Sequence, residues 1–286
     1  MFFGFSLTCT TAAAFEPDYP QPDFPQAAWW SDAWWDQGQI VNTENHNVAV
    51  SETSYVSDGK DVPVMVFRPD DDAKYPAVLF QHGRRGLDEL VQGHAKRLAA
   101  RGFVVFAPDI FRANFMDPYP IEHDEALEAD VGAGVDALLT RRDLSSDKVC
   151  LYSHTRGGYY TLRVAVTQNR QENQVACYVS YYPHWQNPNA PEPLQVYGYA
   201  PEADGLKLPT LIFIGEKDQY QRRRPIETAV RFLQKENRDV TLFVYPGVGR
   251  GFDFRPPTVR TFADDLATKD ALMRASRFMK AHLTGN

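Results

Sequence analysis

The chain has 286 residues, of which 43% are hydrophobic and 23% are charged, and its formal net charge at pH 7 is -7. This length and composition are typical of one large globular domain with a sizeable core. The acidic balance argues against a nucleic-acid partner, and no apolar run approaches the roughly 18 residues of a membrane span.

The first residues, MFFGFSLTCTTAAA, combine an apolar stretch with small residues. Ala12 and Ala14 fit an A-x-A cleavage site before Phe15, so residues 1–14 are expected to be a signal peptide, although they begin without Lys or Arg. Cys9 would then be removed with the signal. This predicts a periplasmic or secreted protein, and the alternative is a disordered start on a cytoplasmic one.

Residues 15–46 are rich in Pro and Trp. Because Pro interrupts regular pairing, we expect an extended arm with a short helical turn. Four indoles are expected to pack on the domain surface, since a free apolar patch of that size favours aggregation. The alternative is that these indoles form an aromatic platform for a ligand. The four tryptophans are Trp29, Trp30, Trp34 and Trp35.

Residues 47–286 read as a single domain in which strands alternate with helices. The expected strands are 47–56, 62–67, 77–81, 103–107, 149–152, 175–181, 210–214 and 241–245. The expected helices are 87–102, 122–140, 157–167, 225–235 and 266–283. This alternation predicts an α/β fold with a mainly parallel sheet covered on both faces. In such sheets the site lies at the carboxyl ends of the strands.

Two cysteines, Cys150 and Cys177, lie inside apolar strand segments. Two cysteines do not make a disulfide framework, and free Cys behaves as a small hydrophobic residue. We therefore expect buried free thiols.

The stretch 148–158, KVCLYSHTRGG, reads as a buried strand that runs into a tight turn and then a helix. That is the form of a nucleophile elbow, whose usual pattern is G-x-S-x-G. Here Ser153 replaces the first Gly and Thr155 occupies the nucleophile position. Gly157 and Gly158 keep the tight turn.

Six segments in order carry a resemblance: PAVLFQHGRRGL, RLAARGFVVFAPD, SHTRGG, VACYVSYYP, LIFIGEKD and VYPGVGRGFDF. Over residues 48–284 the chain resembles the dienelactone hydrolase family of α/β-hydrolases. The resemblance implies the α/β-hydrolase fold, with a mostly parallel central sheet and helices on both faces. It also implies a small-molecule ester or lactone as substrate and no cofactor.

The family's catalytic positions carry over onto this sequence. The nucleophile falls on Thr155, the acid on Asp218 and the base on Arg250, in the order typical of α/β-hydrolases. The resemblance places the oxyanion hole at the backbone N–H groups of Arg84 and Arg156. Main-chain donors survive side-chain replacement.

Two of these residues conflict with ordinary hydrolysis. The guanidinium of Arg250 stays charged and has no acceptor, so it cannot take a proton from the nucleophile. A hydroxyl such as that of Thr155 is a weak nucleophile without a base, and its β-branched side chain fits a strained turn poorly. The sequence thus predicts a degenerate triad and a possible pseudoenzyme with little ordinary esterase activity.

Other polar residues are expected near the site. His184 follows a strand at the carboxyl edge and is the best replacement base, whereas His82 more often fixes the oxyanion loop. Both, with Arg85, are predicted to contact the substrate. No histidine has metal-ligand spacing, so no metal is implied. Three more histidines are expected to face solvent on helices: His94, His123 and His282.

Two functions from different classes remain open. One is a hydrolase of esters or lactones with altered chemistry, and the other is a non-catalytic binder of a small carboxylate or of a protein partner. Arginines gather near the predicted site, and guanidinium groups suit carboxylates. Arg250 either pairs with Asp218 or helps to bind an anion. The remaining arginines are Arg84, Arg85, Arg156, Arg222, Arg223 and Arg224.

Overall fold

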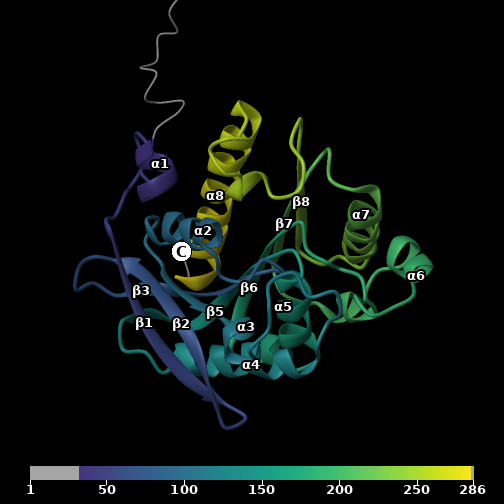
Figure 1. Cartoon of the computed structure of the whole chain (residues 1–286), viewed down its shortest axis with the longest axis horizontal. Helices are drawn as coiled ribbons and strands as arrows, with labels where there is room; N and C mark the ends of the chain where they lie inside the picture. The colour runs from purple at the N-terminus through teal and green to yellow at the C-terminus, as the bar shows by residue number, and fades with distance from the viewer. Residues whose placement is uncertain (1–31, 285–286) are drawn as a thin grey trace, which may run out of the picture.

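The computed structural model describes residues 32–284 (Figure 1). Eight strands form one sheet: β1 (Val48–Ser57), β2 (Lys60–Pro69), β3 (Tyr75–Gln81), β4 (Val104–Pro108), β5 (Leu144–His154), β6 (Val175–Tyr181), β7 (Thr210–Gly215) and β8 (Val240–Tyr245). Their order is β1-β2-β4-β3-β5-β6-β7-β8. The pairs β1–β2 and β2–β4 are antiparallel, and all other neighbours are parallel.

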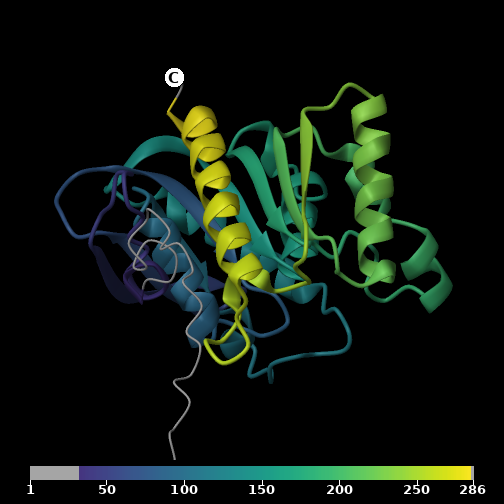
Figure 2. The same cartoon turned by 90° about the horizontal axis from the view of Figure 1, so that it is seen from above.

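Helices cover both faces of this sheet. They are α1 (Asp32–Gln37), α2 (Glu89–Ala99), α3 (Ile110–Ala113), α4 (Ala126–Leu139), α5 (Gly157–Val166), α6 (Glu192–Tyr197), α7 (Tyr220–Lys235) and α8 (Phe262–Leu283). Short 3₁₀ helices are η2 (Arg170–Glu172), η3 (Pro201–Gly205) and η4 (Phe252–Phe254). α2 and α8 pack on one face and α4 and α5 on the other (Figures 1 and 2). The α/β-hydrolase fold predicted from the sequence is confirmed.

Several elements begin at other residues than expected, and strand β5 begins at Leu144 rather than at residue 149. α4 begins at Ala126 rather than at residue 122, and α7 begins at Tyr220, before Pro225. A proline inside a helix removes one backbone hydrogen bond, and here the helix continues through it. No helix among residues 32–284 has the length and apolar character needed to cross a membrane.

Along the neighbouring strands β5 and β6, successive side chains point to opposite faces of the sheet. On the α5 face, Thr161 Oγ1 donates to Ser153 Oγ over 3.1 Å, and Ser153 Oγ donates to Ser180 Oγ over 2.9 Å. Because successive residues of a strand face opposite sides, the next positions point to the α2 and α8 face. These are Tyr152, His154 and Tyr181, all buried.

The tryptophans of α1 pack against the domain. Trp34 and Trp35 are buried, and Trp35 Nε1 donates to Asp265 Oδ1 of α8 over 3.1 Å. The guanidinium of Arg97 lies 4.9 Å from the centroid of a Trp35 ring. These contacts attach the arm to α2 and α8. The predicted signal peptide at residues 1–14 lies outside the described residues, as do Trp29 and Trp30.

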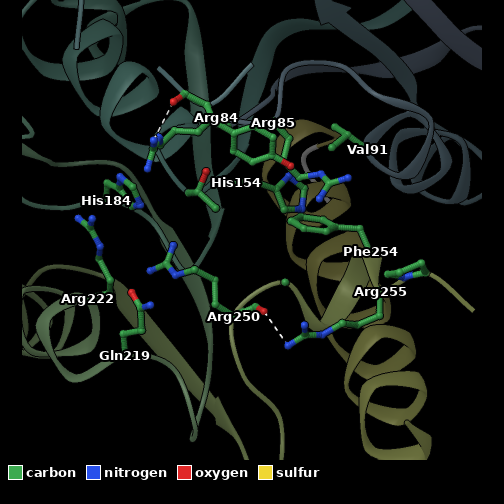
Figure 3. A pocket seen from close by; sticks show the side chains of 15 residues that line it. Arg84, Arg85, Val91, His154, His184, Gln219, Arg222, Arg250, Phe254 and Arg255 are labelled. Carbon is green, nitrogen blue, oxygen red and sulfur yellow. Dashed lines mark hydrogen bonds between the residues drawn. The ribbon is translucent and has the colours of Figure 1, made fainter. Parts of the chain in front are cut away.

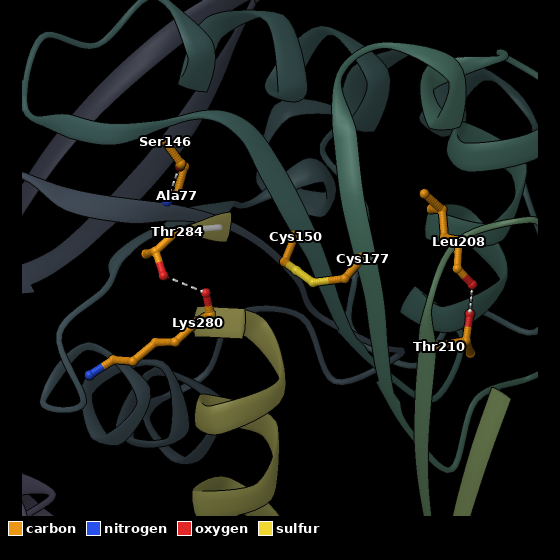
Figure 4. The surroundings of a disulfide bond; sticks show 8 residues. All are labelled: Ala77, Ser146, Cys150, Cys177, Leu208, Thr210, Lys280 and Thr284. Carbon is orange, nitrogen blue, oxygen red and sulfur yellow. Dashed lines mark hydrogen bonds between the residues drawn. A yellow bond between two sulfur atoms is a disulfide. The ribbon is translucent and has the colours of Figure 1, made fainter. Parts of the chain in front are cut away.

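Cys150 and Cys177 form a disulfide (Figure 4), so the prediction of free thiols was wrong. The two residues are register partners on the neighbouring strands β5 and β6, with their Cα atoms 4.7 Å apart. That separation allows a disulfide. Strand register decides the pairing, and register was not readable from the spacing of the cysteines.

The disulfide can be tested by thiol titration under denaturing, non-reducing conditions. Of three cysteines in the sequence, only Cys9 should react, and none should react if residues 1–14 are removed. A sequence separation of 27 predicts that Cys150→Ser with Cys177→Ser lowers the free energy of unfolding by about 3 to 4 kcal/mol. Two additional reactive thiols in protein prepared without reductant would contradict the pairing.

Candidate active site

Thr155 lies at the sharp turn between β5 and α5. Its φ is 48°, in the left-handed region that β-branched residues rarely occupy. The turn needs Gly157, because a Cβ there would lie 2.5 Å from the carbonyl oxygen of Gln81. The elbow geometry is therefore present, and Thr155 is strained in it, a feature that clusters at functional sites.

A cavity of about 350 Å³ opens beside Thr155 at the carboxyl edge of the sheet. The loops after β3, β6, β7 and β8 contribute to its lining, together with the elbow. Among the described residues the lining holds five arginines and no carboxylate (Figure 3). The arginines are Arg84, Arg85, Arg222, Arg250 and Arg255.

Arg250 is tied to the site by two hydrogen bonds. Its Nε donates to Asp218 Oδ1 over 3.1 Å, and its Nη1 donates to the carbonyl oxygen of Tyr182 over 2.8 Å. The Asp218 side chain is fully buried, whereas that of Arg250 is 21% exposed at the cavity. The remaining nitrogen, Nη2, is buried without a partner among the described residues. Arg250 thus pairs with Asp218 and still has an N–H group to offer.

His184 also lines the cavity, and its backbone N–H donates to the carbonyl oxygen of Thr155 over 2.8 Å. Burial first, and then the charges of nearby arginines, hold the pKa of His184 well below its usual value. Among these arginines, Arg250 and then Arg222 have the largest effects on that pKa. His184 is therefore a neutral imidazole at physiological pH and a weak base.

The backbone amides of Arg84 and Arg156, predicted as oxyanion donors, have no hydrogen-bond acceptor among the described residues. The arginine side chains were expected to gather at the site, but the guanidinium of Arg156 does not line the cavity. It donates instead to the carbonyl oxygens of the segment from Pro120 to Glu122. Gly83 packs on the elbow, because a Cβ there would lie 1.8 Å from Thr155 Oγ1.

Residues 62–283 match the model of the dienelactone hydrolase family. The chain belongs to the dienelactone hydrolase family. Two similar proteins carry the name "Putative carboxymethylenebutenolidase". The one from Yersinia pestis is 26% identical over 76% of this chain and 85% of its own length. The one from Escherichia coli K12 is 25% identical over 79% and 86%.

Solved structures agree on the fold. A "Putative Dienelactone Hydrolase" from Klebsiella pneumoniae superposes with a TM-score of 0.64 at 22% identity, over 82% of this chain and 99% of that one. Bacterial brefeldin A esterase superposes with a TM-score of 0.62 at 19% identity, over 86% and 79%. This member of the dienelactone hydrolase family therefore shares its fold with α/β-hydrolase esterases.

Two residues predicted to contact substrate lie less favourably in this family member. His82 is fully buried behind the cavity, outside its lining, with Nδ1 2.9 Å from the carbonyl oxygen of Gly83. Burial lowers the pKa of His82. His82 therefore contacts the loop that carries Gly83 and does not face the cavity. Arg85 lines the cavity but pairs with Asp88.

The structure also assembles a buried network that the sequence analysis missed. His154 Nε2 and His94 Nδ1 each lie 2.8 Å from Asp253 Oδ2. Tyr182 Oη donates to Asp253 Oδ1, and Arg97 Nη2 donates to the Asp253 carbonyl oxygen over 2.8 Å. Every one of these side chains is buried on the α2 and α8 face of the sheet.

This network shifts the ionisation of its members. Burial lowers the pKa of His94 to about 4. Burial by itself raises the pKa of Asp253, but the interactions with His154 and His94 outweigh it and hold that pKa far below its usual range. The carboxylate therefore stays ionised, and it lies close to the buried guanidinium of Arg97.

Two histidines expected to face solvent are buried. His94 belongs to the network, and His123 precedes α4 in a loop, with Nε2 2.8 Å from Glu128 Oε1. His282 lies on α8 and is partly exposed. The signal that could have found the network is Asp253, three residues after Arg250 in the same predicted loop.

The donor atoms of His94, His154 and Asp253 lie within 4.8 Å of one another, so this group could hold a metal ion. Arg97 already offsets the charge of Asp253, and a divalent cation would add uncompensated charge to a buried site. The charge balance favours a hydrogen-bonded network over a metal centre.

Proposed function

We propose that this dienelactone hydrolase family member has lost ordinary nucleophile–base chemistry and retains a pocket for small carboxylates. The observation that carries the proposal is the ion pair of Arg250 with Asp218 at the cavity wall, with Nη2 of Arg250 buried and without a partner among the described residues. At the base position, a guanidinium has donors and no acceptor. The triad positions are thus assembled for binding and not for proton abstraction.

His184 does not supply the missing base in this proposal. Its pKa is held well below the usual value by burial and by arginine charges, so it accepts a proton reluctantly. General bases work best when their pKa lies near the working pH. A feeble ester or lactone hydrolase that uses His184 is the competing function, and loss of activity in His184→Ala would support it.

The arginines favour an anionic ligand. The guanidinium of Arg222 donates no hydrogen bond to any described residue, and its pKa is lowered by burial and then by the charges of Arg250 and Arg84. An anion among these three guanidinium groups would relieve that repulsion, and Arg suits the planar carboxylate. The relatives' name refers to carboxymethylenebutenolide, a lactone that carries a carboxylate.

Calorimetric titration with mono- and dicarboxylates tests the proposal. A charge-assisted hydrogen bond contributes about 1.5 to 3 kcal/mol, so Arg250→Ala should weaken binding by about ten- to a hundredfold. Arg274→Ala is the matched control, because Arg274 pairs with Asp270 on the surface of α8, away from the cavity. If no carboxylate binds at millimolar concentration, or if Arg250→Ala binds as wild type does, Arg250 is only the structural partner of Asp218.

We also propose that the protein is exported to an oxidising compartment. The Cys150–Cys177 disulfide supports this, because structural disulfides are rare in the cytosol. Expression in a Gram-negative host, followed by fractionation and mass spectrometry, should find a periplasmic chain that begins at Phe15. An intact N-terminus in the cytoplasmic fraction would refute the proposal.

A further inference from the structure

His154 and Asp253 form a pair that the family's triad positions do not include. His154 is the last residue of β5, directly before Thr155, and Asp253 lies in η4, after β8. His154 Nε2 is 2.8 Å from Asp253 Oδ2, and His154 is 1% exposed yet lines the cavity. A histidine at the cavity wall is therefore paired with a buried carboxylate, and that carboxylate lies in the loop that carries Arg250.

The hydrogen bonds settle which nitrogen of His154 carries the proton. An ionised Asp253 accepts from Nε2–H, so a neutral His154 keeps its lone pair on Nδ1. Nδ1 is buried without a partner among the described residues. The carboxylate is itself held in place, because Tyr182 Oη donates to its second oxygen. An oriented imidazole with a free lone pair has the requirements of a general base.

His94 shows what distinguishes His154. It approaches the same oxygen of Asp253, but its Nε2 is 2.5 Å from Tyr152 Oη and it does not line the cavity. Within residues 32–284, only His154 in this network combines a free ring nitrogen with a place at the cavity wall.

We infer that His154, oriented by Asp253, is the general base of this pocket and activates water against carboxylate-bearing esters or lactones. The inference rests on the proposed function, since the arginines must hold the substrate carboxylate so that the reacting carbonyl stays in place. Water replaces Thr155 as the nucleophile. Positioning of this kind lowers the barrier, because the reacting groups no longer have to find one another.

In the first step, His154 Nδ1 takes a proton from water while the water oxygen bonds to the carbonyl carbon. The carbonyl oxygen becomes an oxyanion, which the backbone N–H groups of Arg84 and Arg156 are free to bind. In the second step, the C–O bond to the leaving alkoxide breaks, and imidazolium donates its proton to that alkoxide. The net reaction consumes one water and yields an acid and an alcohol.

The test compares p-nitrophenyl hydrogen succinate with its neutral methyl ester. Wild type should hydrolyse the anionic ester faster than buffer and discriminate against the neutral one. His154→Gln should lower kcat for the anionic ester by about a hundredfold or more, with the calorimetric Kd for succinate unchanged. His123→Gln, which alters another buried histidine–carboxylate pair outside the cavity, should keep wild-type kcat.

Two further measurements keep the inference falsifiable if His154→Gln fails to fold. Wild type should show a normal solvent deuterium isotope effect on kcat, and intact-mass spectra during turnover should show no acyl adduct. Asp253→Asn should shift the pH–rate profile. Four results would each overturn the inference. They are a wild-type hydrolysis rate no higher than that in buffer alone, full activity in His154→Gln, no isotope effect, and an acyl adduct on Thr155. If succinate binds but the anionic ester is not hydrolysed, only this inference is refuted. If succinate does not bind, the proposed function is refuted.

Discussion

Thr155→Ser combined with Arg250→His should raise kcat/KM for p-nitrophenyl acetate by about a hundredfold or more over wild type. Wild type should turn over this neutral ester very slowly or not at all, because Arg250 cannot accept a proton. Asp218 is already placed to orient the new imidazole, since one of its oxygens accepts from Arg250 Nε over 3.1 Å. Initial rates of p-nitrophenolate release measure the effect.

The single replacements are the controls for this gain. Either change alone should do little, because the members of a triad act as a unit. Thr155→Ala with Arg250→His should stay inactive if Ser at position 155 is the nucleophile of the double variant. Robust wild-type turnover, or an equal gain from one replacement, would show that the triad positions are not what limits hydrolysis.

Acid should destabilise the protein well above the range where exposed carboxylates titrate. The pKa of His94 is lowered from 6.5 to about 4, so between those values the unfolded chain binds more protons than the native one. Stability is therefore full above about pH 6.5 and falls as the pH drops toward 4. His94 alone should lower the free energy of unfolding by about 2 kcal/mol at about pH 5. The lowered pKa of His184 acts in the same direction.

Urea unfolding at several pH values between about 8 and about 5 measures this dependence. His94→Gln should flatten it, whatever its effect on stability at neutral pH, and His282→Gln on the outer part of α8 is the matched control. Asp253, whose pKa is also lowered, extends the loss of stability to lower pH. Equal free energies of unfolding at pH 8 and pH 5 would show that these histidines are not kept neutral by burial.

The replaced triad residues and the buried network have a common consequence for the site. Arg250 keeps the ionic partner that a catalytic histidine would have in Asp218, and it adds a positive charge to the cavity. In the inference above, the base function comes from the other side of Thr155, where His154 and Asp253 meet. Carboxylate recognition by Arg250 and proton transfer by His154 would come from different residues, so each can be removed separately by mutation.

The sequence by itself determined the fold and the neighbourhood of Thr155, Asp218 and Arg250. Alternating strands and helices specify a parallel sheet, and the carboxyl ends of its strands converge, so motifs at those ends meet whatever their separation along the chain. The glycines after Thr155 likewise predict a tight turn. The structure gives the reason at Gly157, where a Cβ would lie too close to the carbonyl oxygen of Gln81.

Only the tertiary structure decided the rest, because it depends on register and on which elements face each other. Register brings Cys150 opposite Cys177. The direction of one side chain turns the Arg156 guanidinium away from the cavity toward backbone carbonyls. His154 does point away from Thr155, as strand alternation requires, but it points at Asp253, which the chain places 99 residues later. Local sequence patterns contain no information about such a meeting, since it arises from packing α2 and η4 on one face of β5.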